Sequence, residues 1–183
     1  MSIHVGEFNE DVARLLNQGG IGILRTDTLY GIVGRADNKE TVERIFYVKQ
    51  RSPTKPPISL ISQMSQLLDS YDEALLGRLG SLWPGKHTVI LPSQAGPEWL
   101  RRGTESVSYR LPDNLALRSL IDRTGPIIAP SANPEGHRPA MTIDEAVSYF
   151  GDSVDFYVDG GIVTDETPSK VFRFTAEGME RLR

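Results

Sequence analysis

The sequence of 183 residues contains no cysteine, which excludes disulfide bridges, thiolate metal sites and a cysteine nucleophile. It has only three histidines, so a histidine-rich zinc site is not expected. It also lacks any apolar run near the roughly 20 residues that a membrane span requires, and its polar N-terminal segment does not read as a signal peptide. These absences predict a cytoplasmic protein with no membrane contact and no metal site of its own.

The sequence has no overall excess of basic residues, because its formal net charge is −4. Against that background, the segment 44–68 carries four basic residues and no acidic one: Arg44, Lys49, Arg51 and Lys55. Three prolines in residues 53–57 stiffen the same segment. Lysine and arginine side chains on a rigid loop predict an anion site, most simply for a phosphate chain. The alternative is a solvated basic loop.

Hydrophobic periodicity predicts a mixture of helices and strands. Helices are expected at residues 10–17, 40–48, 114–124 and 142–150, with one or two more over 64–82; strands are expected at 21–24, 58–61, 87–91, 106–111, 127–129, 154–158 and 170–174. Some strands follow each other directly, which favours a mixed sheet with packed helices over a purely parallel one. At this length, we expect one α/β domain that spans residues 1–183.

Four polar side chains are crowded into residues 26–30, directly after the first predicted strand. If the strand continued, Thr26, Thr28 and Tyr30 would share one face, with Gly31 and Gly34 leaving room for a ligand. The alternative is an edge strand with exposed threonines.

Ser131 and Asn133 follow a buried strand at its carboxyl end, a position where open α/β sheets bind ligands. Without further support, the same residues would be a polar turn. Arg110 lies inside an apolar strand and therefore needs an anionic partner, which could be a ligand carboxylate or an internal aspartate. The acidic segment 141–169 is best interpreted as a solvated face, although Asp159 could orient a site.

Two short motifs resemble other catalytic signatures but do not satisfy them. Residues 80–87 nearly match a phosphate-binding P-loop, yet His87 stands where a serine or threonine is required and a helix precedes the motif. Residues 52–55 and 131–133 match two penicillin-binding motifs, but the third motif is out of order. We reject both.

Seven motifs occur in the order found in the threonylcarbamoyl-AMP synthases, the YrdC-like family, which the chain resembles over about residues 19–171. They are Thr26–Gly31, Lys49-x-Arg51 with Lys55-Pro56, Leu82–Gly85 with Thr88, Tyr109–Pro112, Gly125–Asn133, Asp159–Gly161 and Pro168-Ser169. The resemblance implies a single twisted α/β domain with a concave basic ligand face, in a short form without a C-terminal extension.

The resemblance also implies an enzyme that condenses L-threonine, bicarbonate and ATP into threonylcarbamoyl-AMP and pyrophosphate. Separate tRNA-modification proteins would consume the product. By this resemblance, ATP is bound by Lys49, Arg51, Thr88, Ser131 and Asn133, and threonine by Thr26, Arg110 and Ser169. The chemistry needs no protein nucleophile, and Mg²⁺ is expected to be held by the nucleotide.

Four positions depart from the family pattern: Arg25, Leu60, Lys86 and Lys170. Two other functions remain open at this point. A concave basic groove would suit double-stranded RNA, although the acidic net charge argues against that. Carbamoyl-AMP chemistry, as in the related domain of hydrogenase-maturation proteins, would need carbamoyl phosphate and further domains.

Overall fold

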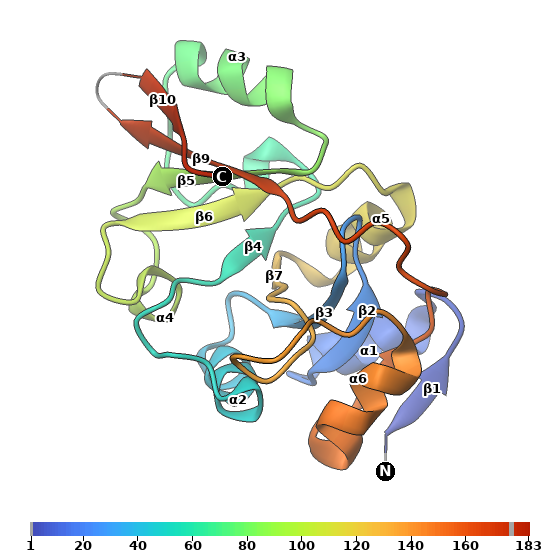
Figure 1. The fold of residues 1–183 in the computed structure, drawn as a ribbon. Helices are drawn as coiled ribbons and strands as arrows, with labels where there is room; N and C mark the ends of the chain where they lie inside the picture. The colour runs from blue at the N-terminus through green and yellow to red at the C-terminus, as the bar shows by residue number, and fades with distance from the viewer. Residues whose placement is uncertain (1, 176–177) are drawn as a thin grey trace.

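Ten strands form one mixed sheet in a computed structural model that describes residues 2–175 and 178–183. The strand order is β1-β8-β2-β3-β7-β4-β6-β5-β9-β10. Figure 1 shows the C-terminal pair β9 and β10 beside β5, at the opposite end of the sheet from the N-terminal strand β1. The predicted class, a mixed α/β sheet with packed helices, is confirmed.

The elements follow the chain closely in the predicted order. The strands are β1 (Ile3–Val5), β2 (Gly22–Arg25), β3 (Tyr30–Arg35), β4 (Ile58–Leu60), β5 (His87–Pro92), β6 (Ser106–Arg110), β7 (Ile127–Ile128), β8 (Phe156–Val158), β9 (Lys170–Thr175) and β10 (Gly178–Arg181). The helices are α1 (Glu10–Asn17), α2 (Lys39–Lys49), α3 (Glu73–Leu82), α4 (Glu98–Arg101), α5 (Leu115–Thr124) and α6 (Ile143–Phe150), with short 3₁₀ turns η1 (Met64–Gln66) and η2 (Gly151–Ser153).

Helix starts are fixed by side-chain caps that the sequence indicates. Asn38, Asn114 and Thr142 each accept a hydrogen bond from the backbone N–H three residues later, at 3.1, 2.9 and 3.2 Å. Each such cap satisfies one of the free N–H groups of the first helical turn. This is why α2, α5 and α6 begin within one residue of the predicted positions.

The sheet buries an apolar layer on each face. One layer packs α1 and α5 against residues such as Leu24, Val33 and Leu60. The other packs α2, α3, α4 and α6 against residues such as Ile23 and Ile32. Because adjacent residues of a strand point to opposite faces, this division follows directly from the strand sequences. Within the described residues, no helix is long and apolar enough to cross a membrane.

The polar stretch after β2 is not part of a strand, so the prediction of a shared strand face was wrong. Residues 26–29 form the turn of a hairpin in which β2 pairs antiparallel with β3, with Arg25 opposite Tyr30. Thr26 Oγ1 accepts from the N–H of Thr28 at 3.2 Å and donates to the carbonyl of Leu29 at 2.8 Å. These local hydrogen bonds offer the backbone an alternative to the sheet ladder.

Candidate functional site

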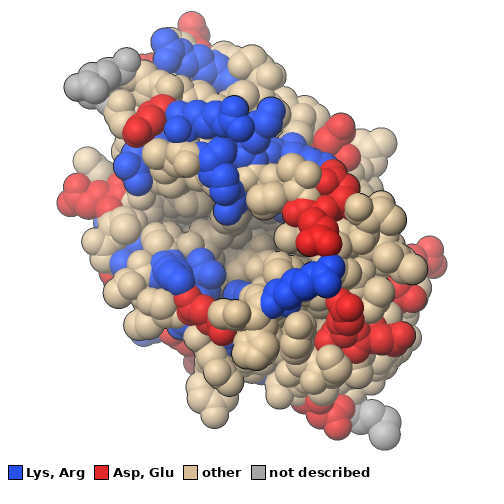
Figure 2. Space-filling model, in the orientation of Figure 1, with Lys and Arg blue, Asp and Glu red and all other residues tan. Residues whose placement is uncertain are grey.

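A cavity of about 330 Å³ opens where the middle strands meet. Distant chain segments line it: Thr26 and residues 28–31 of the hairpin, Arg51, Ile58, Arg110, the segment 129–131, Pro139, Pro168-Ser169 and Arg183. An isolated bridge between Gly31 and Ser131 joins two of these segments. Figure 2 shows Lys and Arg side chains gathered around the hollow in this face, so the predicted concave basic face is confirmed.

Gly31 permits the close contact at the base of the cavity. A Cβ atom built there would lie 3.3 Å from both the carbonyl oxygen of Pro130 and Cγ2 of Thr26. Contacts this short leave little space for any side chain, so the glycine lets the two segments approach. Thr26, one of the predicted threonine-binding residues, is buried at this junction and lines the cavity.

Lys49 holds the segment that carries Ser131 and Asn133. Its Nζ donates to the carbonyl oxygens of Ser131 and Asn133 at 2.7 and 2.6 Å and to Asn133 Oδ1 at 3.1 Å. These contacts use all three donors of the ammonium group. Burial lowers the pKa of Lys49 to about 8, and the positive charges of Arg51 and Lys55 also lower it. Lys49 is therefore buried against the loop and does not itself line the cavity.

Asn133 fixes the same loop from within. Its Nδ2 donates to the carbonyls of Pro134 and His137 at 2.9 and 2.8 Å, and its Oδ1 accepts from Ser131 Oγ at 2.7 Å. Ser131 is the member of this group that lines the cavity. The structure thus brings Lys49, Ser131 and Asn133 together, as the sequence predicts.

Arg51 lines the cavity, and its guanidinium is held in place by two backbone carbonyls and an aromatic ring. Its Nε and Nη2 donate to the carbonyls of Lys55 and Pro56 at 3.3 and 3.1 Å, and its guanidinium lies 5.5 Å from the centre of the Phe46 ring. Burial lowers the pKa of this guanidinium below its ordinary value. The proline-rich loop therefore orients the cation, as the prolines suggest.

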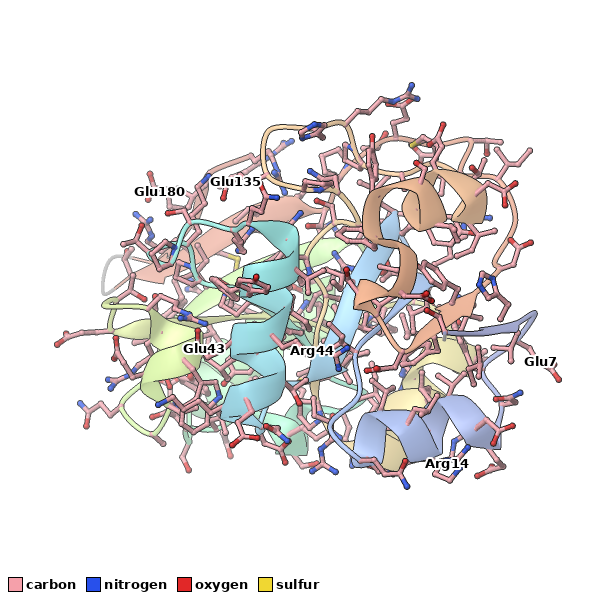
Figure 3. All side chains as sticks on the ribbon, turned by 90° about the horizontal axis from the view of Figure 1, so that it is seen from below. Glu7, Arg14, Glu43, Arg44, Glu135 and Glu180 are labelled. Carbon is pink, nitrogen blue, oxygen red and sulfur yellow. The ribbon has the colours of Figure 1, made fainter. Side chains whose placement is uncertain are left out.

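The other basic residues of the same segment point elsewhere. Arg44, labelled in Figure 3, projects from α2 and pairs with Asp155 at 2.7 Å. Lys55 pairs with Glu135, which Figure 3 places near the C-terminal end of α2. The local excess of positive charge thus overstates the number of cations at the cavity.

Arg110 lies at the wall of the cavity, and its side chain is only 4% exposed. Its Nη2 forms an ion pair with Oδ1 of Asp27 at 2.9 Å. Of the two partners considered from the sequence, the internal aspartate is therefore present. Burial raises the pKa of Asp27 despite the nearby arginine, and burial lowers the pKa of Arg110. Among the described residues, Nε of Arg110 has no hydrogen-bond partner.

Thr88 and Ser169 meet beside the cavity, with 2.8 Å between their hydroxyl oxygens. Ser169 lines the cavity, whereas Thr88 lies behind it. Arg183, which the sequence did not indicate, also lines the cavity and donates from Nη2 to the carbonyl of Ser169 at 3.1 Å. Its position depends on the backbone pairing of residues 182–183 with Val171, which no local motif reveals.

Residues 159–169 form a segment without regular secondary structure. Side chains from the β2–β3 hairpin and from the residue before β5 hold this segment in place. The Tyr30 hydroxyl donates to the carbonyl of Gly161 at 2.8 Å, and Arg25 Nη1 donates to that of Gly160 at 2.8 Å. Lys86 pairs with Asp165 at 2.9 Å. Arg25 and Lys86, two of the positions that depart from the family pattern, thus hold this segment.

The other two departures lie outside the cavity lining. Leu60 is fully buried in the layer under α1 and α5. Lys170 is exposed at the start of β9. Neither side chain lines the cavity, although Leu60 is the sheet partner of Arg110, which does.

Fold and site together define a class: an α/β protein in which arginine and hydroxyl side chains line a small cleft, suited to a phosphate- or carboxylate-bearing ligand. The sequence profile of the Sua5/YciO/YrdC family, described as "Telomere recombination", matches residues 14–183. The chain belongs to this family.

The sequences of curated relatives align with this chain over most of their length. The chain is 34% identical over 159 residues to the threonylcarbamoyl-AMP synthase of Marinobacter nauticus, covering 84% of each chain. It is 32% identical over 163 residues to the synthase of the same name from Pseudomonas aeruginosa PAO1, covering 87% of this chain and 88% of that one.

Solved structures have the same fold. P. abyssi Sua5 complexed with L-threonine superposes with a TM-score of 0.89 at 28% identity. The match covers all of this chain, which spans 57% of the length of that Sua5 chain. E. coli YciO, at 20% identity and a TM-score of 0.85, supports the fold alone.

Proposed function

We propose that the chain is an L-threonylcarbamoyladenylate synthase, which condenses L-threonine, bicarbonate and ATP and releases pyrophosphate. The observation that carries this proposal is that the predicted ATP- and threonine-binding residues converge on one cavity. Five of the eight residues predicted for ATP and threonine line one cavity, and the other three hydrogen-bond to its lining residues or share a network with them. Relatives that carry the synthase name, and a Sua5 structure with L-threonine bound, support the same activity.

The predicted residues divide into two groups by role. Arg51 and the Ser131 hydroxyl line the cavity and would hold the phosphates of ATP, with Lys49 and Asn133 fixing the Ser131 loop. Arg110, Thr26 and Ser169 also line the cavity and would hold the carboxylate and hydroxyl of threonine. Thr88 supports this arrangement through Ser169.

The reaction needs positioning and charge neutralisation more than covalent help. The threonine amine adds to the carbon of bicarbonate with loss of water and forms a carbamate. A carbamate oxygen then attacks the α-phosphorus of ATP, and the bond to pyrophosphate breaks. Cationic side chains aimed at the leaving group stabilise its growing charge.

Ser131 is not placed as a nucleophile. Its hydroxyl donates to Asn133 Oδ1, which is not a base. His137, the histidine nearest in sequence, packs its ring against Tyr149, 6.0 Å between centroids. The geometry therefore supports a ligand-positioning role for Ser131.

Mg²⁺ would be bound at this site by the phosphates of the nucleotide and not by carboxylates of the protein. The described residues that line the cavity include no aspartate or glutamate, and the described residues contain no cluster of three or more potential metal ligands. Hard cations such as Mg²⁺ bind oxygen ligands, which the phosphates and water supply. Bound in this way, the cation would neutralise phosphate charge.

We further propose that residues 1–183 act as one catalytic domain in the cytoplasm. Support comes from the single sheet, which joins the N-terminal strand β1 and the C-terminal strand β10. The adenylate product would pass to separate tRNA-modification proteins, and direct RNA contact would be secondary because the net charge is −4.

The test is pyrophosphate release with ATP, threonine and bicarbonate, each omitted in turn. Release should require all three. Release that is unchanged without threonine or bicarbonate would contradict the proposed reaction, and dependence on carbamoyl phosphate would favour the carbamoyl-AMP alternative.

A further inference from the structure

A second cavity, of about 460 Å³, lies on the opposite face of the sheet from the candidate site. The strands β4 and β6 separate the two. Ile58 and Arg110 line the candidate site, whereas their neighbours Ser59 and Tyr109 line the second cavity. Ser59 and Tyr109 are direct partners in the parallel pairing of β4 with β6, so their side chains lie next to each other on this face.

The walls of the second cavity are mainly flat and apolar. They include Trp99, Tyr109, Leu67, Pro97 and Pro126. The indole of Trp99 is fixed by a hydrogen bond of 2.9 Å from its Nε1 to the carbonyl of Ala36. A volume of this size is within the range of about 300–1,000 Å³ that is typical of small-molecule sites. It also exceeds the roughly 150 Å³ cavity that admits one benzene ring.

Two polar groups stand in this apolar wall without full pairing. Ser59 is 1% exposed, and its hydroxyl has no hydrogen-bond partner within the described part of the chain. The Tyr109 hydroxyl accepts from the N–H of Leu68 at 3.3 Å, and no described group accepts its proton. Burying a hydroxyl without a partner costs free energy, so both groups offer a donor to a ligand acceptor.

We propose that this cavity binds a planar heteroaromatic molecule of one or two fused rings with a hydrogen-bond acceptor in the ring. The flat walls hold the rings, and the hydroxyl of Ser59 or of Tyr109 donates to the acceptor. The proposal is independent of the synthase activity, since none of the residues assigned to ATP or threonine lines this cavity.

Two probes of the same shape, quinoline and naphthalene, test this directly. Only quinoline carries a ring acceptor. The chain has two tryptophans, so the ¹⁵N-labelled protein gives two indole N–H signals. The signal of Trp99 should move on titration, while that of Trp83, whose Nε1 donates to the carbonyl of His87, should not. Quinoline should bind about tenfold more tightly, the ratio that one ordinary hydrogen bond gives.

Variants separate the hydrogen bonds from the shape of the cavity. The double variant Ser59→Ala/Tyr109→Phe should lose the preference for quinoline and leave naphthalene binding unchanged. Ser65→Phe, at an exposed lining residue, should block both probes, whereas Ser81→Phe, at an exposed serine of α3 away from the lining, should not.

Three results would overturn the proposal. One is an unmoved Trp99 signal at millimolar quinoline. Another is an undiminished preference for quinoline when both hydroxyls are removed. The third is a Trp99 signal that moves with protein concentration in the absence of probe, because that would identify the occupant as a second copy of the chain.

Discussion

At the residue scale, the ion pair between Arg110 and Asp27 is the most consequential feature, because both side chains are 4% exposed. Removing one partner of a buried pair leaves an uncompensated charge. The internal aspartate also explains why the arginine can remain buried before any ligand arrives. The sequence indicates that Arg110 needs an anion, but it does not distinguish a ligand from an internal aspartate, since the pairing joins a turn and a strand whose residues are 83 positions apart.

Replacing Arg110 should therefore affect threonine more than ATP. We expect Arg110→Met to weaken threonine binding by about 2–5 kcal/mol, the range for loss of a buried charge pair. Calorimetric titration with each ligand measures this, and Arg110→Met/Asp27→Asn removes the unpaired carboxylate as a control for stability. Equal weakening of both ligands in the folded double variant would contradict the assignment.

Lys49 should make ATP binding depend on pH. Its pKa of about 8 lies below the ordinary value for lysine, so it loses its proton as the pH rises through 8. We expect ATP affinity to fall over pH 7–9, as the charge that organises the Ser131 loop disappears. Lys49→Arg, which keeps its charge, should remove this fall, and a fall that persists in that variant would assign it to another group.

The same shift has a defined sign for stability. Between pH 8 and about 10.4, the ordinary lysine pKa, the unfolded chain keeps the Lys49 proton and the folded chain does not. The Lys49 contribution to the free energy of unfolding should therefore rise with pH in this window and be flat below it. Urea unfolding of the native chain and Lys49→Met across pH 7–10 measures that contribution as a difference, and a contribution that falls with pH would contradict the shift.

At the element scale, the loop 131–137 is fixed mainly by Asn133, which joins Ser131, Lys49 and two carbonyls. Ser131→Ala removes one neutral hydrogen bond, so we expect at most about a tenfold loss of activity. Asn133→Ala should cost more, because several partners lose their hydrogen bonds. Intact-protein mass spectrometry during turnover should show no adduct, and a covalent adduct on Ser131 would instead make it a nucleophile.

The elements also show which parts of the fold the sequence could predict. Periodicity and caps located α1, α2, α5 and α6, since those signals are local. The strands β1 and β10 and the short helix α4 were not predicted, because they are short and depend on partners distant in the chain. Strand β3 was not predicted either, because the residues before it were interpreted as a continuation of β2. The hairpin at 26–29 was misread because its polar side chains satisfy a turn as well as a strand.

At the scale of the whole molecule, the sheet brings the predicted site residues together from segments between Thr26 and Ser169. Residues with a motif were predictable. Arg183 has no motif, and the role of Asp27 was not predictable from its motif, because these roles arise only from strand pairing and from the contact with Arg110. The cavity therefore depends on Arg183 as well as on the motif residues.

Arg51 gives a loss-of-function control for the central claim. It lines the cavity and is held by backbone carbonyls, so Arg51→Ala should leave the fold intact while abolishing pyrophosphate release. Circular dichroism verifies the fold, and Arg14→Ala, an exposed arginine of α1, is the matched control. Near-normal turnover in Arg51→Ala would contradict its phosphate role.

The most direct measurement is the fate of carbon from ¹³C-bicarbonate. With ATP and threonine present, mass spectrometry should detect a nucleotide product that contains AMP, threonine and one ¹³C atom, formed in equal amount with pyrophosphate. Pyrophosphate released without labelled carbon in any nucleotide product would contradict the proposed synthase.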